Sequence, residues 1–206
     1  YGMEYAYSKG IKVHRDIKPD NIMITQDKRV KITDFGLATI LDKTEIEEGE
    51  VALEDKKIGL SIFQSKSNRV VGTIPYMAPE QFEGREDRRS DIYSFGIVLY
   101  QMISGGKLPF VGRTWEEYYK LHQSGKIPPI NSPLFLSIER CMRQSSHQFE
   151  DFTSLREELE ELLYRERGER IQPPRIEALE AWELGNKGLA LADLGRYNEA
   201  ITCYDN

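Results

Sequence analysis

The sequence contains little cysteine, no long apolar run and no start typical of a secreted protein. Its two cysteines, Cys141 and Cys203, are far apart and form no Cys-x-x-Cys pair, which argues against a disulfide framework and indicates reduced thiols. No apolar run reaches the length of a membrane span, and the first residues lack the features of a signal peptide. We therefore expect a cytoplasmic location, although a membrane anchor elsewhere in a longer protein is not excluded.

The chain also lacks an excess of positive charge. Its 28 Lys and Arg residues and 34 Asp and Glu residues give a formal net charge of -6 at pH 7. No overall basic field is present to attract nucleic acid or anionic lipid, and neither is an expected partner. The 206 residues, 39% of them hydrophobic, suffice for one sizeable core with a small appendage.

Two short β-like runs predict a hairpin. They cover residues 22–25 and 30–33 and are joined by a polar turn at 26–29. Antiparallel strands joined by a tight turn bring their far ends together. We therefore expect Asn21 and Asp34, at the two outer ends, to lie close to each other.

Most of the remaining pattern is helical and predicts a mainly α fold of the α+β class. Residues 1–9 read as the end of an amphipathic helix that Gly10 terminates. Residues 90–103 are apolar on nearly all sides, which predicts a central buried helix capped by Ser90 and ended by Gly105 and Gly106. Further helices are predicted over residues 114–123, 137–143 and 152–165.

Between these elements lies a long segment, residues 37–79, with few periodic apolar positions. Residues 42–55 contain seven acidic residues and one basic residue, which is typical of a solvated loop. A special role for this acidity, as an autoinhibitor or in favouring basic substrates, is the alternative interpretation.

One motif carries the chemistry of the chain. The run from His14 to Asn21 reads HRDIKPDN, and Asp34-Phe35-Gly36 begins thirteen residues after Asn21. A hydroxyl attacking a γ-phosphate needs a carboxylate to take its proton, a cation on the transferred group, and Mg²⁺ held by a carboxylate and an amide. These groups are present as Asp16, Lys18, Asn21 and Asp34.

Residues 1 to about 164 resemble the large, mostly helical lobe of a protein kinase. Four signatures occur in the order typical of that family. They are HRDIKPDN at 14–21, DFG at 34–36, Gly72-Thr73 with Ala78-Pro79-Glu80, and SDIYSFG at 90–96. One such match would be weak, whereas four in sequence are specific.

The resemblance implies a role for each residue of the motif. Asp16 would accept the hydroxyl proton, and Lys18 would steady the γ-phosphate of ATP. Asn21 and Asp34 would hold Mg²⁺. Because Lys18 follows Asp16 by two residues, as in serine/threonine kinases, the resemblance implies protein substrates modified on serine or threonine.

Other residues receive supporting roles from the same resemblance. Thr73 would hydrogen-bond the catalytic loop and shape the peptide site, and Asp91 would hold the backbone of that loop. His14 is expected to be a packed structural residue rather than a general base.

Arg15, beside Asp16, bears on regulation. In kinases with this arginine, a phosphate on the activation loop pairs with it and orders the loop. Ser65 and Ser67 are the predicted phosphorylation sites, with Thr44 and Ser61 as weaker candidates. The alternative is that these are ordinary loop residues and that Arg15 pairs with an acid.

The sequence departs from the family pattern in what it lacks. It contains no glycine-rich loop, no strand lysine and no helix glutamate, which belong to the small lobe of a kinase. We therefore expect activity of the whole protein and not of this piece. A pseudokinase or a repeat-based adaptor without phosphate transfer is the alternative.

A second departure concerns Glu80. The arginine that usually pairs with this glutamate is missing, because residues 145–149 stand where it would occur. An unpaired buried carboxylate is costly. Glu80 is therefore either hydrated, or paired with Arg143 or Arg156, or a source of lower stability.

The end of the sequence differs in style from the rest. Residues 165–180 read as a linker, and from about residue 181 small residues alternate with Leu in a helical hairpin. Residues 181–206 resemble part of a tetratricopeptide repeat, a module that binds protein partners. Such a unit needs further copies, so we expect the protein to continue past Asn206. A generic amphipathic hairpin is the alternative.

Overall fold

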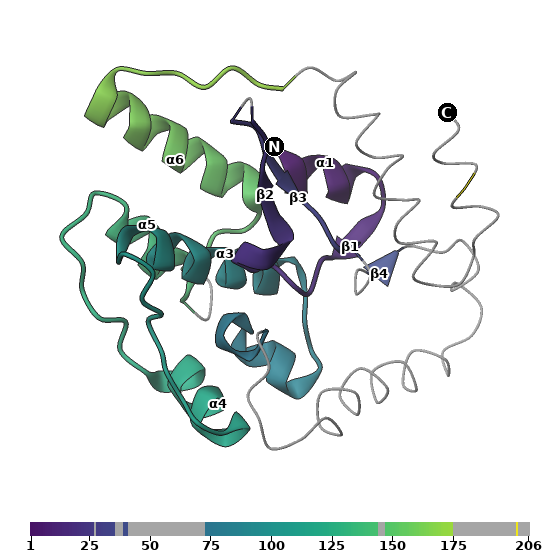
Figure 1. Ribbon diagram of the computed structural model, residues 1–206, viewed down its shortest axis with the longest axis vertical. Helices are drawn as coiled ribbons and strands as arrows, with labels where there is room; N and C mark the ends of the chain where they lie inside the picture. The colour runs from purple at the N-terminus through teal and green to yellow at the C-terminus, as the bar shows by residue number, and fades with distance from the viewer. Residues whose placement is uncertain (27, 36–38, 41–72, 144–146, 175–200, 202–206) are drawn as a thin grey trace.

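Helices dominate the described part of the chain (Figure 1). The computed structural model describes residues 1–26, 28–35, 39–40, 73–143, 147–174 and 201. The predicted acidic segment at 42–55 lies outside the described residues, and so does the predicted repeat apart from residue 201.

The five predicted helices are all present, and none of their ends is shifted by more than two residues. They are α1 (Gly2–Ser8), α3 (Arg88–Ile103), α4 (Trp115–Ser124), α5 (Phe135–Cys141) and α6 (Phe152–Arg167). In the described ranges, three short 3₁₀ turns cover Pro19–Asn21, Ile74–Tyr76 and Pro79–Glu83. Figure 1 shows α3 near the middle of the molecule, with α4 and α6 towards opposite ends.

The predicted hairpin is confirmed. Strands β2 (Ile22–Ile24) and β3 (Val30–Ile32) pair antiparallel. The amide of Thr33 donates to the carbonyl of Asn21 at 2.9 Å, which extends the pairing to the end of the hairpin. A second pair that the sequence did not predict joins β1 (Ile11–Val13) to β4 (Thr39–Ile40).

Helix α3 forms the centre of the core, as predicted. Ile92 and Ile97 are completely buried. The predicted cap at Ser90 is wrong: the helix begins at Arg88, and the side chain of Asp87 accepts from the amide of Arg89 at 2.7 Å. Ser90 instead forms the second half of a capping box, in which its hydroxyl accepts from the amide of Asp87 at 3.1 Å.

Gly96 allows α3 and α5 to approach closely. A Cβ at Gly96 would lie 2.6 Å from the Cβ of Cys141 and 3.0 Å from Cγ of Met142. Such distances force the two helices apart, because a packed core cannot absorb an added methyl group.

We therefore expect Gly96→Ala to lower the free energy of unfolding by about 2 kcal/mol, the usual cost of overpacking. Met102→Ala, on the same helix but 71% exposed, is the control and should change it by less than about 0.5 kcal/mol. Urea denaturation of both variants measures the difference. Equal stabilities of the two variants would contradict the close approach.

His122, on α4, is surrounded by four aromatic rings. Its ring centroid is 5.2–5.9 Å from those of Phe82, Tyr93, Phe110 and Tyr118. Its Nδ1 and the hydroxyl of Tyr93 lie 2.9 Å apart, whereas the buried Nε2 has no hydrogen-bond partner among the residues the structure describes. Burial lowers the pKa of His122 from 6.5 to about 4, so the ring is neutral at pH 7.

This pKa predicts a loss of stability in acid. As the pH falls from 6.5 to about 4, His122 binds a proton in the unfolded chain but not in the folded one, and the folded state is destabilised. The loss amounts to about 3 kcal/mol, at about 1.4 kcal/mol per pKa unit. His122→Gln cannot titrate in this range. Denaturation curves at pH 7 and pH 4 should show a smaller drop for the variant, and equal drops would refute the assignment.

Helix α6 continues beyond its predicted end. Residues 165–167 are helical, and Gly168, at φ +67°, ends the helix. The segment without regular structure therefore begins at Gly168 and runs to residue 174, the last one described before the gap.

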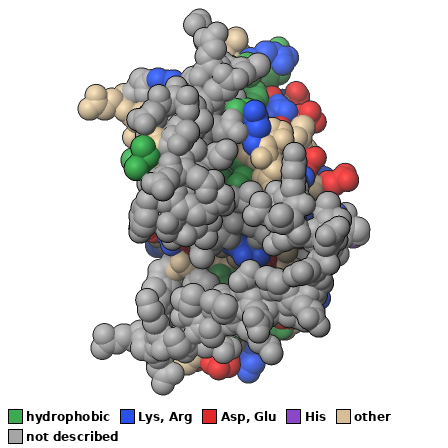
Figure 2. Space-filling view, turned by 90° about the vertical axis from the view of Figure 1, so that its right-hand side faces the viewer, with side chains coloured by type: hydrophobic (Ala, Val, Ile, Leu, Met, Phe, Trp, Pro, Cys, Tyr) green, Lys and Arg blue, Asp and Glu red, His purple; other side chains and the backbone are tan. Residues whose placement is uncertain are grey.

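Charged side chains of both signs lie beside each other on the surface. In the face shown in Figure 2, the described Lys and Arg side chains neighbour Asp and Glu side chains. Arg140 pairs with Glu158 at 2.6 Å, and Arg156 pairs with Glu4 at 3.0 Å and with Glu160 at 3.2 Å. Among the described helices, none is both long and apolar enough to cross a membrane.

Candidate active site

The carboxylate of Asp16 is held by two of the predicted site residues. Lys18 Nζ lies 2.7 Å from Asp16 Oδ2 and donates to Thr73 Oγ1 at 2.9 Å. Asn21 Nδ2 donates to the carbonyl oxygen of Asp16 at 2.8 Å and to its Oδ2 at 2.9 Å. The structure thus brings Asp16, Lys18, Asn21 and Thr73 together.

The second carboxylate oxygen of Asp16 is different. Oδ1 is buried and has no hydrogen-bond partner in the part of the chain that the structure describes. An unsatisfied buried oxygen is costly, and such atoms occur where a ligand or substrate supplies the missing partner. Both donors of the site are directed at Oδ2, so Oδ1 is the oxygen of this carboxylate with unused acceptor capacity.

Asn21 and Asp34 lie at the same end of the β2–β3 hairpin. The amide and hydroxyl of Thr33 both donate to the carbonyl of Asn21, at 2.9 and 3.3 Å, and Asp34 follows directly. Asp34 is exposed and has a left-handed backbone, at φ +63°. Because the amide nitrogen of Asn21 bonds Asp16, its oxygen is the atom left for a metal.

An amide oxygen and a carboxylate oxygen suit Mg²⁺, which binds oxygen ligands and usually keeps phosphate and water ligands as well. Within the described ranges, no group of three or more His, Cys, Asp or Glu side chains could hold a metal ion. A magnesium site that relies on two protein oxygens and nucleotide phosphates does not need such a group. Asn21 and Asp34 therefore fit the predicted cofactor.

Asp91 holds the start of the catalytic loop, defined here as residues 14–21. Its Oδ2 accepts from the amide of His14 and from the hydroxyl of Tyr7, both at 2.6 Å, and its Oδ1 accepts from the amide of Arg15 at 2.9 Å. Asp91 is only 1% exposed. Burial raises the pKa of Asp91, while these three hydrogen bonds act in the opposite direction.

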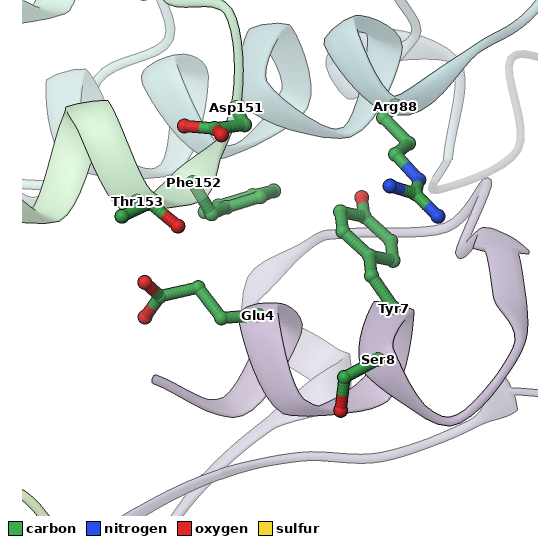
Figure 3. Close-up of a pocket in the computed structure, with 7 residues that line it drawn as sticks. All are labelled: Glu4, Tyr7, Ser8, Arg88, Asp151, Phe152 and Thr153. Atoms are coloured by element: carbon green, nitrogen blue, oxygen red, sulfur yellow. The ribbon is translucent and has the colours of Figure 1, made fainter.

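Tyr7 is a residue that the sequence did not single out. Burial raises the pKa of its hydroxyl far above the ordinary value, so it remains a donor to Asp91. Its ring also lies in a pocket of about 190 Å³ between α1 and the first turns of α3 and α6 (Figure 3), where the guanidinium of Arg88 lies 4.6 Å from the ring centroid. The pocket is lined by Glu4, Tyr7, Ser8, Arg88, Asp151, Phe152 and Thr153.

The catalytic-loop pattern and its surroundings match one family of proteins. The family model described as protein kinase domain matches residues 1–176. The chain belongs to the protein kinase domain family. Its helical fold with small antiparallel sheets agrees with that assignment.

Individual relatives are named as serine/threonine-protein kinases. A probable serine/threonine-protein kinase of Clostridium acetobutylicum is 34% identical over 76% of this chain and 22% of its own length. Serine/threonine-protein kinase PknB of Mycolicibacterium smegmatis is 40% identical over 53% of this chain and 15% of its own length. Serine/threonine-protein kinase ksg1 of Schizosaccharomyces pombe is 38% identical over 62% and 21%. The chain thus spans about a fifth or less of the length of these relatives.

In this kinase domain His14 is a packed residue, as its surroundings indicate. It is fully buried, and its ring lies 4.5 Å from that of Phe35. Nδ1 accepts from the amide of Asp16 at 3.3 Å, and Nε2 lies 3.2 Å from the carbonyl of Thr33. A neutral ring with its proton on Nε2 satisfies both contacts, and burial lowers the pKa of His14 accordingly.

Arg15 pairs with an acid of the kinase domain. Its Nη2 lies 2.9 Å from Oε1 of Glu86, which corresponds to the alternative considered above. Ser65 and Ser67 lie outside the described residues, so a phosphate partner for Arg15 stays a prediction.

Glu80 has a partner that the sequence did not indicate. The hydroxyl of Ser90 donates to Glu80 Oε1 at 2.6 Å. The two arginines proposed for Glu80 pair elsewhere, Arg143 with Glu139 and Arg156 with acids of α1 and α6. A hydroxyl at the first turn of α3 therefore stands where the family usually has an ion pair.

Proposed function

We propose that the whole protein is a serine/threonine protein kinase that transfers the γ-phosphate of ATP to hydroxyl groups of protein substrates. The observation that carries this proposal is the state of Asp16. Its Oδ2 is held by Lys18 and Asn21, while its buried Oδ1 has no partner among the described residues. A general base needs a fixed carboxylate with one free acceptor directed at the substrate.

The other residues of the site have matching roles. Bound ATP with Mg²⁺ supplies the phosphoryl group and offsets its charge. Asn21 and Asp34 would hold the metal, and Lys18 would move from Asp16 and Thr73 towards the transferred phosphate. Thr73 would hydrogen-bond the catalytic loop and shape the peptide site, and its contact with Lys18 at 2.9 Å supports that role.

Phosphate transfer by the whole protein tests the proposal directly. Labelled ATP, Mg²⁺ and a mixture of protein substrates should yield phosphoserine and phosphothreonine on hydrolysis, and chelation of the metal should stop the reaction. Phosphotyrosine as the main product would contradict the proposed specificity. Binding of ATP with no transfer at all would favour the pseudokinase alternative.

The repeat-like segment carries a second part of the proposal. We infer from its sequence pattern that residues 181–206 begin a tetratricopeptide region that selects protein partners. Removing this region from the whole protein should leave the rate on a short peptide unchanged and alter the ranking among protein substrates. An unchanged ranking would refute a role in partner selection.

A further inference from the structure

The segment that follows the Ala-Pro-Glu motif, residues 81–86, contacts Arg15 twice. Gln81 Nε2 donates to the carbonyl oxygen of Arg15 at 3.0 Å. Glu86 Oε1 lies 2.9 Å from Arg15 Nη2. The first contact fixes the backbone of Arg15, which precedes Asp16, and the second fixes the side chain of Arg15.

The amide orientation of Gln81 is determined by its two partners. Its Oε1 accepts from the amide of Ala78 at 2.8 Å, and its Nε2 donates to the carbonyl of Arg15. A flipped amide would place donor against donor and acceptor against acceptor. Gln81 therefore joins residues 78–81 to the catalytic loop in one defined way.

The backbone of Arg15 needs such support. Arg15 has φ +73°, a left-handed conformation that side chains other than glycine seldom adopt. A strained residue of this kind persists only where its surroundings determine its conformation. The bonds from Arg15 to Asp91, Gln81 and Glu86 supply that determination.

The guanidinium of Arg15 also needs a partner, and Glu86 supplies it. Arg15 Nε is buried without a hydrogen-bond partner among the described residues, and the side chain of Glu86 is only 12% exposed. Removing the carboxylate would leave the guanidinium with one nitrogen already unsatisfied and, among the residues the structure describes, no anion in contact with it.

We propose that Gln81 and Glu86 are positioning residues that set the conformation of the catalytic loop, with Glu86 as the permanent anionic partner of Arg15. Glu86 then holds Arg15 without a phosphate on the activation loop. The effect on catalysis rests on the proposed kinase function, whereas the effect on the loop itself does not.

Hydrogen exchange of the whole protein tests the loop. The amides of Arg15 and Asp16 bond Asp91 and His14, so a peptide covering residues 13–21 reports whether the loop is held. Glu86→Gln and Gln81→Glu should each speed exchange of these amides by about tenfold. Glu86→Gln removes a hydrogen bond that involves a charge, and Gln81→Glu places a carboxylate against the carbonyl oxygen of Arg15. Gln81→Glu keeps the acceptor for Ala78 and changes only the group that faces Arg15.

Glu158→Gln is the matched control, because it removes an ion pair of similar length between α5 and α6. It should leave exchange at residues 13–21 unchanged. Unchanged exchange in both Glu86→Gln and Gln81→Glu would overturn the proposal. Should Glu86→Gln fail to fold, Gln81→Glu and Glu86→Asp give the same reading, and Glu86→Asp should exchange more slowly than Gln81→Glu.

Steady-state kinetics test the consequence for catalysis. Glu86→Gln should lower kcat about tenfold with little change in KM for ATP, since the loop and not the nucleotide site is released. Glu86→Asp, which keeps the charge, should recover part of the rate. Faster exchange with unchanged kcat would overturn the positioning role. Faster exchange in a protein whose wild type transfers no phosphate would support the loop contacts and refute the proposed function.

Discussion

Asp16→Asn is expected to lower the rate of phosphate transfer by the whole protein at least about 10²-fold, the low end for a positioned proton acceptor. The amide can still accept from Lys18 and keep the loop folded. It cannot take a proton from the substrate hydroxyl, because its oxygen is far less basic than a carboxylate. Single-turnover transfer from labelled ATP to a peptide measures the loss without interference from product release.

The matched control for this variant is Asp20→Asn. Asp20 lies four residues further along the same loop and is exposed. It has the same charge but takes no part in the contacts around Asp16, so the control should transfer phosphate at close to the wild-type rate. Equal rates of transfer by the Asp16 variant and the wild type would contradict the role given to Asp16.

Asp91→Asn is expected to lower the free energy of unfolding by about 3 kcal/mol, because a buried donor left without an acceptor costs about 1–3 kcal/mol. The two carboxylate oxygens accept three hydrogen bonds, from His14, Arg15 and Tyr7. Asparagine offers one oxygen and turns an amide donor towards at least one of those donors. Guanidinium chloride denaturation measures the difference.

Tyr7→Phe provides the graded comparison for Asp91. It removes one of the three donors and keeps the ring, so its cost should be smaller, at about 1 kcal/mol, the net value of one hydrogen bond. The order wild type, Tyr7→Phe, Asp91→Asn is the expected order of decreasing stability. A loss for Asp91→Asn no larger than that for Tyr7→Phe would mean that the three bonds do not hold the loop.

Local features of this lobe could be predicted from the sequence. The β2–β3 hairpin followed from two apolar runs and a polar turn, and the buried helix α3 followed from its apolar character. Asn21 and Asp34 could be placed at one end of the hairpin because strand pairing fixes which residues lie opposite each other. These signals act over a few residues, so the sequence expresses them directly.

The features that the sequence missed depend on distant contacts or on close alternatives. Asp87 and Ser90 are both good cap residues, and in a capping box each bonds the other's amide, so composition alone did not separate them. The partner of Glu80 required knowing that the start of α3 lies beside it. Glu86 and Tyr7 belong to no motif, and their contacts with the catalytic loop arise only when the chain folds.

The strands β1 and β4 show a further limit. They cover only three and two residues, and their pairing shifts register between Ile11 and Val13. Runs this short carry no period that distinguishes a strand from a loop. Their pairing is set by the fold around them, not by their own residues.

A crystal structure of the whole protein with Mg²⁺ and a non-hydrolysable ATP analogue tests the central claim most directly. We expect oxygen atoms of Asn21 and Asp34 on the metal at about 2.1 Å, Lys18 at the γ-phosphate, and Asp16 Oδ1 open towards the substrate side of that phosphate. A nucleotide and metal bound away from these residues, or Asn21 and Asp34 directed at different parts of the molecule, would contradict it.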